Sequence, residues 1–256
     1  MKAKEIQSYV TSQIFGKKIF AYEVVESTNT TAKSLIQDST DGTIVIADAQ
    51  TAGRGRLKRE WLSEPKKNLT FSVIIKPEIA PELFGVLSLY AGLSVAEAIE
   101  SVAKLRPVCK WPNDVMLNGK KFCGILSEAV FNREMLAGVI VGIGININQS
   151  IFPRELESIA TSLLQVTGKE LDRFSILAAV LDRMEYNYTS IKTGNSTGII
   201  EGWKKYSTMF GKEITINQDK HPVRGIAKRL DDDGGLILLT NKGEEKFLAG
   251  DVALCS

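Results

Sequence analysis

The chain has 256 residues, of which 44% are hydrophobic and 24% charged, a composition typical of a globular protein with one or two domains. Its 32 Lys and Arg residues and 30 Asp and Glu residues give a net charge of +2, weaker than the basic bias expected of a dedicated nucleic-acid binder. Its 3 cysteines lack metal-ligand spacing and are odd in number, which argues against zinc and a disulfide framework and favours a reducing cytoplasm.

The N-terminal part of the chain predicts strands alternating with a helix. Residues 1–18 predict a weak helix and a turn, without an apolar signal segment. Capping residues at 27–29 predict a helix to residue 37. Apolar, β-rich or alternating runs predict strands over residues 19–25, 43–49 and 69–76. Residues 50–68 are polar, rich in Gly and Arg and without apolar periodicity, so they predict a long loop, which in a compact domain is usually functional or disordered.

The middle of the chain predicts a buried helix, a series of strands and then further helices. Helical spacing of apolar residues predicts helices over residues 83–102, 154–166, 173–192 and 197–210. Short apolar runs separated by turns predict strands over residues 108–111, 115–117, 122–130 and 135–143. No apolar run is expected to approach the roughly 20 residues of a membrane span, so we expect a soluble chain without a membrane partner.

The character of the sequence changes near Gly211. Beyond it, strands are predicted over residues 213–216, 223–230, 236–240 and 245–249, with tight turns between them. Four or five short strands within about 45 residues predict a small barrel. The sequence therefore predicts an α+β domain over residues 1–210 and a small all-β domain over residues 211–256.

The first segment that could carry chemistry is Gly53-Arg54-Gly55-Arg56. Its glycines let the backbone approach a ligand closely, and its arginines can hold a phosphate or carboxylate with paired hydrogen bonds. Trp61 adds a face for stacking a flat ring. A solvated basic loop is an equal alternative, and the segment is not a Walker loop because the chain lacks that glycine and lysine spacing.

Three further segments resemble binding sites less strongly when each is taken alone: Lys110-Trp111-Pro112-Asn113-Asp114, residues 120–126 and residues 142–148. In the first of them, Asn could read a base edge, Asp could hold magnesium and Lys could approach a phosphate, although a simple turn after a strand is the better interpretation. In the second, lysines at a hairpin tip lead into a buried strand. In the third, alternating glycines in an apolar strand suggest close approach by a ligand or by another backbone, with a bulge as the alternative.

Together with Ser27-Thr28-Asn29 and Gln50, these segments resemble the biotin–protein ligases in their order and spacing over most of residues 19–150. Asp233-Gly234-Gly235-Leu236 and Gly250-Asp251-Val252 resemble the family's C-terminal barrel. The resemblance implies that the first domain is the biotin- and ATP-binding catalytic domain. Its expected fold is a mixed β-sheet flanked by helices, similar to class II aminoacyl-tRNA synthetases. A small SH3-like β-barrel is expected to follow it.

The activity that the resemblance implies is that of a biotin–[acetyl-CoA-carboxylase] ligase. Biotin and ATP, with Mg²⁺, would form biotinyl-5′-AMP, and biotin would then pass to a lysine of a biotin carboxyl carrier protein. Many bacterial relatives carry an N-terminal winged helix-turn-helix, for which there is no room before Ser27, so we expect a monofunctional ligase that binds no nucleic acid. A homodimer is expected, with the strand edge near residues 135–148 as a pairing site.

The resemblance also implies roles for individual residues, carried over position by position. Catalytic roles fall to Lys121, Arg56 and Lys110. Lys121 is preferred over Lys120 by its spacing to Gly124. Biotin contacts fall to Ser27, Thr28, Asn29, Gln50, Gly53, Arg54, Gly55, Arg56, Lys121 and Gly124. Nucleotide contacts fall to Arg56, Trp61, Asn113, Asp114 and Asn146, with Trp61 stacking on adenine. The metal ligands stay open, with Asp114 as a candidate support for Mg²⁺.

Three alternatives remain at this stage. A lipoate–protein ligase would have a related fold, but the glycine–arginine run followed by Lys110-Trp111-Pro112-Asn113-Asp114 favours biotin. A non-catalytic, biotin-sensing DNA regulator is disfavoured by the missing N-terminal module. A biotin-binding domain that has lost catalysis ranks low, because every expected charged position is present.

Overall fold

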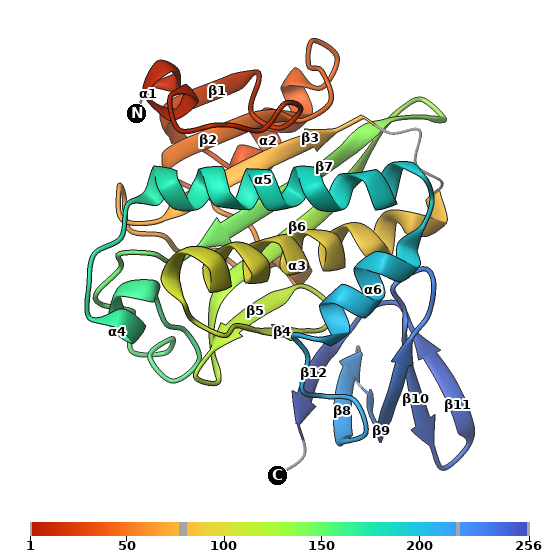
Figure 1. Cartoon of the computed structure of the whole chain (residues 1–256). Helices are drawn as coiled ribbons and strands as arrows, with labels where there is room; N and C mark the ends of the chain where they lie inside the picture. Colours follow the sequence, from red (N-terminus) through yellow and green to blue (C-terminus); the bar gives the residue numbers. More distant parts are fainter. Residues whose placement is uncertain (1, 77–80, 219–220, 255–256) are drawn as a thin grey trace.

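The computed structural model describes residues 2–76, 81–218 and 221–254. Two sheets form its framework (Figure 1). The larger sheet contains seven strands, β1 (Ile19–Val25), β2 (Thr43–Gln50), β3 (Leu69–Ile75), β4 (Val108–Lys110), β5 (Asp114–Leu117), β6 (Lys120–Asn132) and β7 (Met135–Ile145). Their spatial order is β1-β2-β3-β7-β6-β5-β4. The first pair is parallel and the other pairs are antiparallel, so the sheet is mixed, as expected.

Helices cover both faces of the larger sheet. On one face α3 (Phe84–Ala103) and α5 (Arg173–Lys192) lie side by side (Figure 1). The central strands have apolar side chains on both faces because successive residues of a strand point in opposite directions. Ile44 and Ile46 belong to the main core under α3 and α5, whereas Val45 packs in a second core with α2 (Thr28–Leu35). This burial on both faces explains why β2 and β3 are apolar runs and do not alternate.

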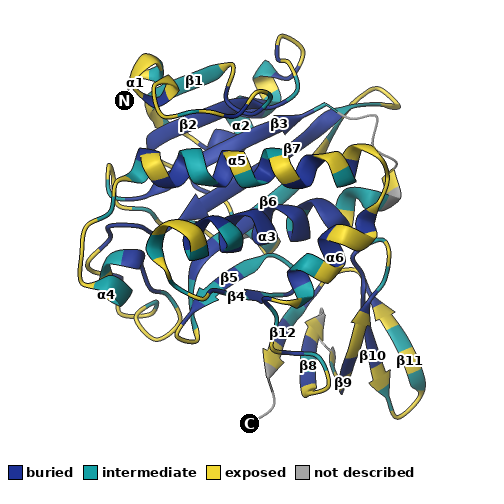
Figure 2. Ribbon diagram, in the orientation of Figure 1, coloured by how far each residue is buried: buried dark blue, intermediate teal, exposed yellow. Residues whose placement is uncertain are grey.

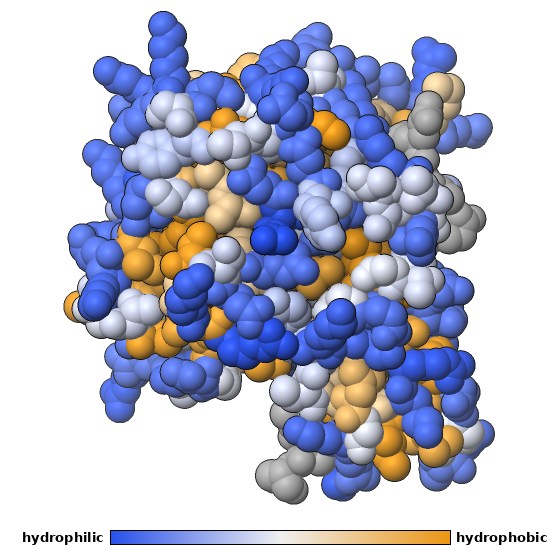
Figure 3. All heavy atoms as spheres, in the orientation of Figure 1, coloured by the Kyte–Doolittle hydropathy of each residue, from blue (hydrophilic) through white to orange (hydrophobic). Residues whose placement is uncertain are grey.

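Helix α3 is the core helix of the larger domain. Twelve of its residues are buried, and its buried side faces the sheet (Figure 2). By length and composition alone α3 could cross a membrane, and about two thirds of its most apolar stretch is buried inside the protein. The expectation that no apolar run approaches this length is therefore wrong for α3. In space-filling view this face of the molecule is covered mainly by hydrophilic side chains, with apolar patches between them (Figure 3).

The smaller sheet is antiparallel and follows the helical part of the chain. It contains β8 (Glu213–Gln218), β9 (His221–Leu230), β10 (Leu236–Thr240), β11 (Gly243–Phe247) and β12 (Asp251–Leu254), in the order β11-β10-β9-β8-β12. Trp111 joins this sheet to the larger domain, because its buried Nε1 donates to the Gly234 carbonyl at 3.0 Å. Gly85, in the first turn of α3, lies so close to Asp233 that a Cβ on Gly85 would come within 2.4 Å of the Asp233 carbonyl oxygen.

Several predicted elements are confirmed, among them the strand over residues 19–25 and the helix over residues 173–192. The helix predicted over residues 154–166 is wrong: turns occupy 154–159, and α4 spans only Leu163–Thr167. The physical reason is a tertiary pairing, because Lys121 N donates to the Ile159 carbonyl and Thr161 N to the Lys121 carbonyl, at 2.8 and 2.9 Å. Strand hydrogen bonds thus replace the helical ones that local sequence favours.

Two other predictions need correction. The predicted helix over residues 197–210 is shorter, since α6 spans Ser196–Lys204 and is followed by turns. The predicted free edge near residues 135–148 is wrong over Val139–Ile145, where β7 pairs with β3 on one side and β6 on the other. The outer strands of this sheet are β1 and β4. The remaining short helical segments are α1 (Ala3–Gln7), η1 (Arg56–Lys58) and η2 (Pro81–Leu83).

Candidate active site

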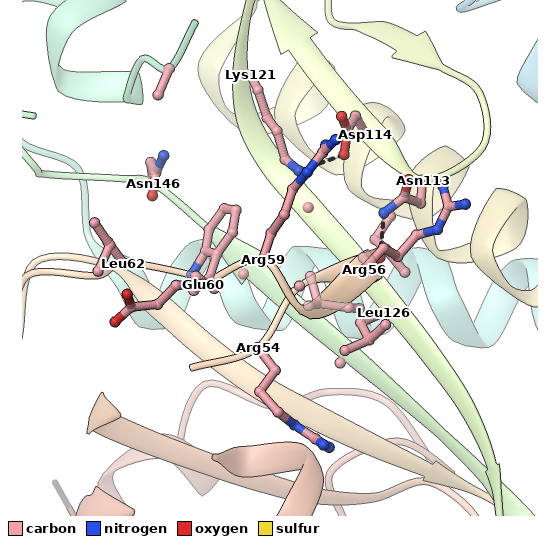
Figure 4. A pocket seen from close by; sticks show the side chains of 18 of the residues that line it. Arg54, Arg56, Arg59, Glu60, Leu62, Asn113, Asp114, Lys121, Leu126 and Asn146 are labelled. Atoms are coloured by element: carbon pink, nitrogen blue, oxygen red, sulfur yellow. Dashed lines mark hydrogen bonds and ion pairs between the residues drawn. The ribbon is translucent and has the colours of Figure 1, made fainter. Parts of the chain in front are cut away.

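A cavity of about 430 Å³ opens beside the ends of the central strands. It brings together residues from α2, β2, the glycine–arginine loop, β4 to β7 and β12 (Figure 4). Among its lining residues are all but one of the predicted site residues, namely Ser27, Thr28, Asn29, Gln50, Arg54, Gly55, Arg56, Trp61, Lys110, Asn113, Asp114, Lys121, Gly124 and Asn146. The exception, Gly53, lines an adjoining hollow beside the same loop.

The glycine–arginine loop, residues 53–61, folds back on itself as a narrow hairpin. Trp61 N donates to the Gly53 carbonyl at 3.0 Å, and Gly55 N donates to the Arg59 carbonyl at 2.7 Å. At the tip, Leu57 has a φ of 54°. Position 53 requires glycine because a Cβ there would lie 2.4 Å from the Trp61 carbonyl oxygen. The loop is therefore internally hydrogen-bonded, and its arginines extend from a defined backbone.

Alternating glycines in β6 and β7 make a low floor under the cavity. A Cβ on Gly144 would lie 2.4 Å from Trp61 Cε2, and a Cβ on Gly142 would lie 2.2 Å from Asn29 Oδ1. The strands therefore leave room for two side chains to lie flat on the sheet. The close approach predicted from the glycine pattern is thus made, within the protein itself, by the side chains of Trp61 and Asn29.

One end of the cavity is lined by neutral polar groups at the start of α2. Thr28 N and Oγ1 both donate to Gln50 Oε1, at 2.8 and 3.2 Å. Ser72 Oγ lies 2.8 Å from Thr28 Oγ1 and 2.6 Å from Asn29 Oδ1. Ser27 is buried at the N-cap position, and its hydroxyl makes no capping bond to the helix. This end of the site offers hydroxyl and amide groups without a net charge.

Two residues of this polar network were missed in the sequence. Ser72 is one of two polar residues, with Thr70, in the buried and mainly apolar strand β3, which could have singled it out. Glu128 accepts from Asn29 Nδ2 at 2.7 Å and pairs with Lys33 at 2.6 Å. Nothing local marked Glu128, because an acidic residue in a strand that emerges towards solvent is ordinary.

The other end of the cavity is cationic. Lys121 Nζ lies 2.6 Å from Asp114 Oδ1, and Arg56 Nη1 donates to Asn113 Oδ1 at 3.0 Å (Figure 4). Burial lowers the pKa of Arg56, against the opposing effect of Asp251 and Asp114. A guanidinium starts from so high a pKa that Arg56 stays charged at neutral pH. The structure therefore holds two cationic side chains in a partly buried site, each by one of the neighbouring residues Asn113 and Asp114.

The two neighbouring lysines of β6 have different surroundings. Lys121 lines the cavity, whereas Lys120 Nζ donates to the Glu157 carbonyl at 2.7 Å and does not line it. Arg59 also lines the cavity and forms an ion pair with Asp251 of β12. The smaller domain therefore contributes a side chain to the site.

Three buried polar atoms at the cavity lack a hydrogen bond within the described part of the chain; one, Asp114 Oδ1, forms the ion pair with Lys121, and the other two have no such partner. They are the indole nitrogen of Trp61 and Oδ1 of Asn146. The amide nitrogen of Asn146 donates to the Thr161 carbonyl at 3.2 Å, which orients its oxygen. A buried donor and a buried acceptor left unpaired are costly in a folded protein, so both atoms call for a bound ligand.

Family models match both parts of the chain. Residues 21–146 match the model described as the biotin/lipoate A/B protein ligase family, and residues 209–254 match the biotin protein ligase C terminal domain. The order of the two matches follows the order of the two sheets. The fold and site thus define a ligase of the biotin and lipoate class.

Individual relatives narrow this class. The bifunctional ligase/repressor BirA of Bacillus subtilis (strain 168) is 36% identical over 99% of this chain and 79% of its own length. The biotin–[acetyl-CoA-carboxylase] ligase of Mycobacterium tuberculosis is 31% identical over 90% of this chain and 87% of its own. A biotin protein ligase from Aquifex aeolicus, solved in complex with biotin and ATP, superposes with a TM-score of 0.82 at 34% identity, covering 93% of this chain and 99% of that one. The chain belongs to the biotin protein ligase family.

Proposed function

We propose that the cavity described above performs both steps of biotin–protein ligation. In the first step the biotin carboxylate attacks the α-phosphate of ATP, so that biotinyl-5′-AMP forms and pyrophosphate leaves. In the second step the ε-amine of a lysine on a biotin carboxyl carrier protein attacks the mixed anhydride, forming an amide and releasing AMP. The observation that supports this assignment is one cavity with a neutral polar end and a cationic end.

The neutral end fits the ureido ring of biotin. A urea presents one carbonyl oxygen and two N–H groups, so it needs donors and acceptors and no charge. Ser27, Thr28, Asn29 and Gln50 offer hydroxyl and amide groups at this end. We assign the ring to this end, with Arg54 and Gly55 of the loop beside it.

The cationic end fits the reacting groups. Bringing a carboxylate to a phosphate joins two anions, and fixed positive charge lowers the barrier most where negative charge develops. Lys121 is assigned to the space between the biotin carboxylate and the α-phosphate, with Arg56 and Lys110 as further cations around it. The mixed anhydride would hydrolyse in water, so the glycine–arginine loop is assigned to cover it.

The nucleotide is assigned to the floor beside Trp61. Asn146 keeps a buried amide oxygen unpaired, which suits the exocyclic amine of adenine. Both polar atoms of the Asn113 side-chain amide already contact protein, since its nitrogen donates to the Ile125 carbonyl and its oxygen accepts from Arg56. We therefore assign Asn113 the task of holding Arg56 against the nucleotide.

Magnesium is proposed as the metal that accompanies ATP. Within the described residues no group of three or more His, Cys, Asp or Glu residues forms a metal cage. Mg²⁺ commonly uses one or two protein carboxylates together with substrate phosphates, which fits the single carboxylate of Asp114 at the cationic end. When bound there, the metal would neutralise phosphate charge. Asp114 would then share its carboxylate between the metal and Lys121.

The assembly and the location of the protein are proposed as well. A homodimer is proposed from the family resemblance, and a dimer built through the larger sheet would use β1 or β4, its outer strands. Sedimentation with and without biotin and ATP tests whether the protein is a dimer.

A cytoplasmic location is supported by the buried free thiols of Cys109 and Cys123. The net charge of +2 supports ligation without DNA binding, and tight, sequence-dependent retardation of promoter DNA would contradict it.

A direct assay tests the proposed reaction. The purified protein is incubated with ATP, a carrier domain and either biotin or lipoate, and pyrophosphate, acyl-adenylate and carrier mass are measured. We expect pyrophosphate release that depends on biotin, a bound biotinyl-AMP and a carrier heavier by one biotinyl group. Incorporation of lipoate alone would contradict the proposal, and binding of biotin without pyrophosphate release would indicate a domain that has lost catalysis.

A further inference from the structure

Glu128 lies next to the active-site cavity and contacts three side chains from two other segments. It follows Gly124 and Leu126 at alternate positions of β6, so its side chain lies on the same face of the sheet as the cavity floor. Its side chain is 22% exposed. One carboxylate oxygen lies 2.6 Å from Lys33 Nζ and the other accepts from Asn29 Nδ2 at 2.7 Å. The third contact is with Arg54 of the glycine–arginine loop.

The contacts of Glu128 differ in strength. Those with Lys33 and Asn29 are short and join β6 to α2, two elements of the larger domain. Arg54 instead approaches with a single nitrogen, Nη2, which lies 3.2 Å from both carboxylate oxygens, and its side chain is 45% exposed. Exposed ion pairs of this kind contribute little and break readily. The carboxylate thus has two short contacts to α2 and one longer, more exposed contact to the loop, which is the pair more readily released.

The direction of Arg54 supports this division. In the close view of the site, Arg54 points away from the Lys121–Asp114 and Arg56–Asn113 pairs, towards α2 (Figure 4). Burial raises the pKa of Glu128. Hydrogen bonds from Lys33 and Asn29 and the charges of Lys33 and Arg54 lower the pKa by more than burial raises it, so the net shift is downward. The group is therefore an anion at neutral pH, able to hold a guanidinium.

We propose that Glu128 is a positioning residue that latches the glycine–arginine loop through Arg54 and, with the same carboxylate, orients the Asn29 amide at the neutral end of the cavity. Closure of the loop and alignment of the polar end are then coupled through one side chain. Release of the Arg54–Glu128 pair lets the loop open for substrate entry. The contacts of Glu128 with Lys33 and Asn29 keep α2 in place meanwhile. This inference rests on the proposed function, because it concerns the retention of biotinyl-AMP.

The test compares three substitutions that each remove one charge from the cluster. Glu128→Gln keeps an oxygen that can accept from Asn29 but removes the anion, Arg54→Gln removes the loop partner, and Lys33→Gln is the matched control on α2. Each protein is loaded with biotinyl-AMP, and both the dissociation rate of the adenylate and its single-turnover formation rate are measured. We expect about two- to fivefold faster dissociation for Glu128→Gln and Arg54→Gln, and an unchanged rate for Lys33→Gln.

The double variant and salt provide checks that do not depend on one substitution. Because both residues act in one contact, Glu128→Gln with Arg54→Gln should release the adenylate no faster than the faster single variant. Raising NaCl from about 0.1 M to about 1 M should speed release from the wild type and leave Glu128→Gln nearly unchanged, since salt screens exposed charge. Thermal unfolding of each variant verifies that it is folded.

The outcomes separate the latch from the proposed function. Equal release rates in Glu128→Gln and Lys33→Gln, or release from the double variant equal to the product of the single effects, would overturn the latch. A wild type that binds biotin and ATP but forms no biotinyl-AMP would overturn the proposed function, and the latch with it. A wild type that forms and retains the adenylate, with all variants equal to it, would overturn the latch alone.

Discussion

Lys121 and Lys120 are chemically identical neighbours with different tasks. Lys121 lines the cavity beside Asp114, whereas Lys120 is tied to the Glu157 carbonyl. Lys121→Ala should lower biotin-dependent pyrophosphate release about 100-fold or more, because it removes charge needed in the transition state. Lys120→Ala is the matched control and should change the rate little. Near-normal release by folded Lys121→Ala would show that another cation has this role.

Gly144 carries a second prediction at the scale of one residue. A methyl group on it would lie 2.4 Å from the Trp61 ring, so the indole must move off the floor. If the ring stacks on adenine, Gly144→Ala should raise the KM for ATP about tenfold, the order of one base–aromatic stack. Gly198→Ala in α6, whose added methyl would be 3.5 Å from Ser190 Oγ, is the control. An unchanged KM for ATP in Gly144→Ala would argue against stacking by Trp61.

The glycine–arginine loop is the element on which retention of the intermediate depends. Arg56 ties it to Asn113 and to the Gly250 carbonyl, at 3.0 and 3.4 Å. Arg56→Gly removes both contacts and adds backbone freedom, so biotinyl-AMP should escape about tenfold faster, with a smaller effect on its formation. Escaped anhydride would label lysines of an unrelated protein such as albumin. Labelling confined to the carrier would contradict a retention role.

The order of the loop itself is a further expectation at this scale. If residues 50–62 act as a mobile lid, their amide hydrogens should exchange faster in the empty protein than in the protein saturated with biotin and ATP. Hydrogen exchange followed by mass spectrometry measures this directly. Equal protection in both states would mean that the loop is permanently closed, and substrate entry would then need another route.

At the scale of the whole molecule, the two sheets are joined at the active site. Trp111 follows β4 and donates a buried hydrogen bond to Gly234, while Arg59 of the loop pairs with Asp251 of β12. Trp111→Phe leaves the Gly234 carbonyl without its donor and should lower the free energy of unfolding by about 1–3 kcal/mol. Urea denaturation measures this change. An unchanged midpoint and slope would show that the joint contributes nothing to stability.

Much of the architecture could be read from local pattern. Strand and helix periodicities placed most elements within a few residues, because burial against one core imposes the same periods that the side chains show. The residues predicted for the site included most of the cavity's polar lining, since ligand chemistry requires particular residue types, but not Arg59, Glu60, Thr70, Ser158 or Asp251. The helix predicted over residues 154–166 is wrong because the backbone of this segment pairs with Lys121, a partner that lies far away in sequence.

The sequence by itself determined the two-part organisation, the periodic elements and the set of chemical groups available to the site. Only the tertiary structure decided which groups meet: that β7 is an inner strand, that Lys121 faces the cavity and Lys120 does not, and that Glu128 contacts both α2 and the loop. The physical reason is that periodicity and turn chemistry are local properties of the chain. Register, strand order and ion pairing depend instead on contacts between residues distant in sequence, which no local pattern encodes.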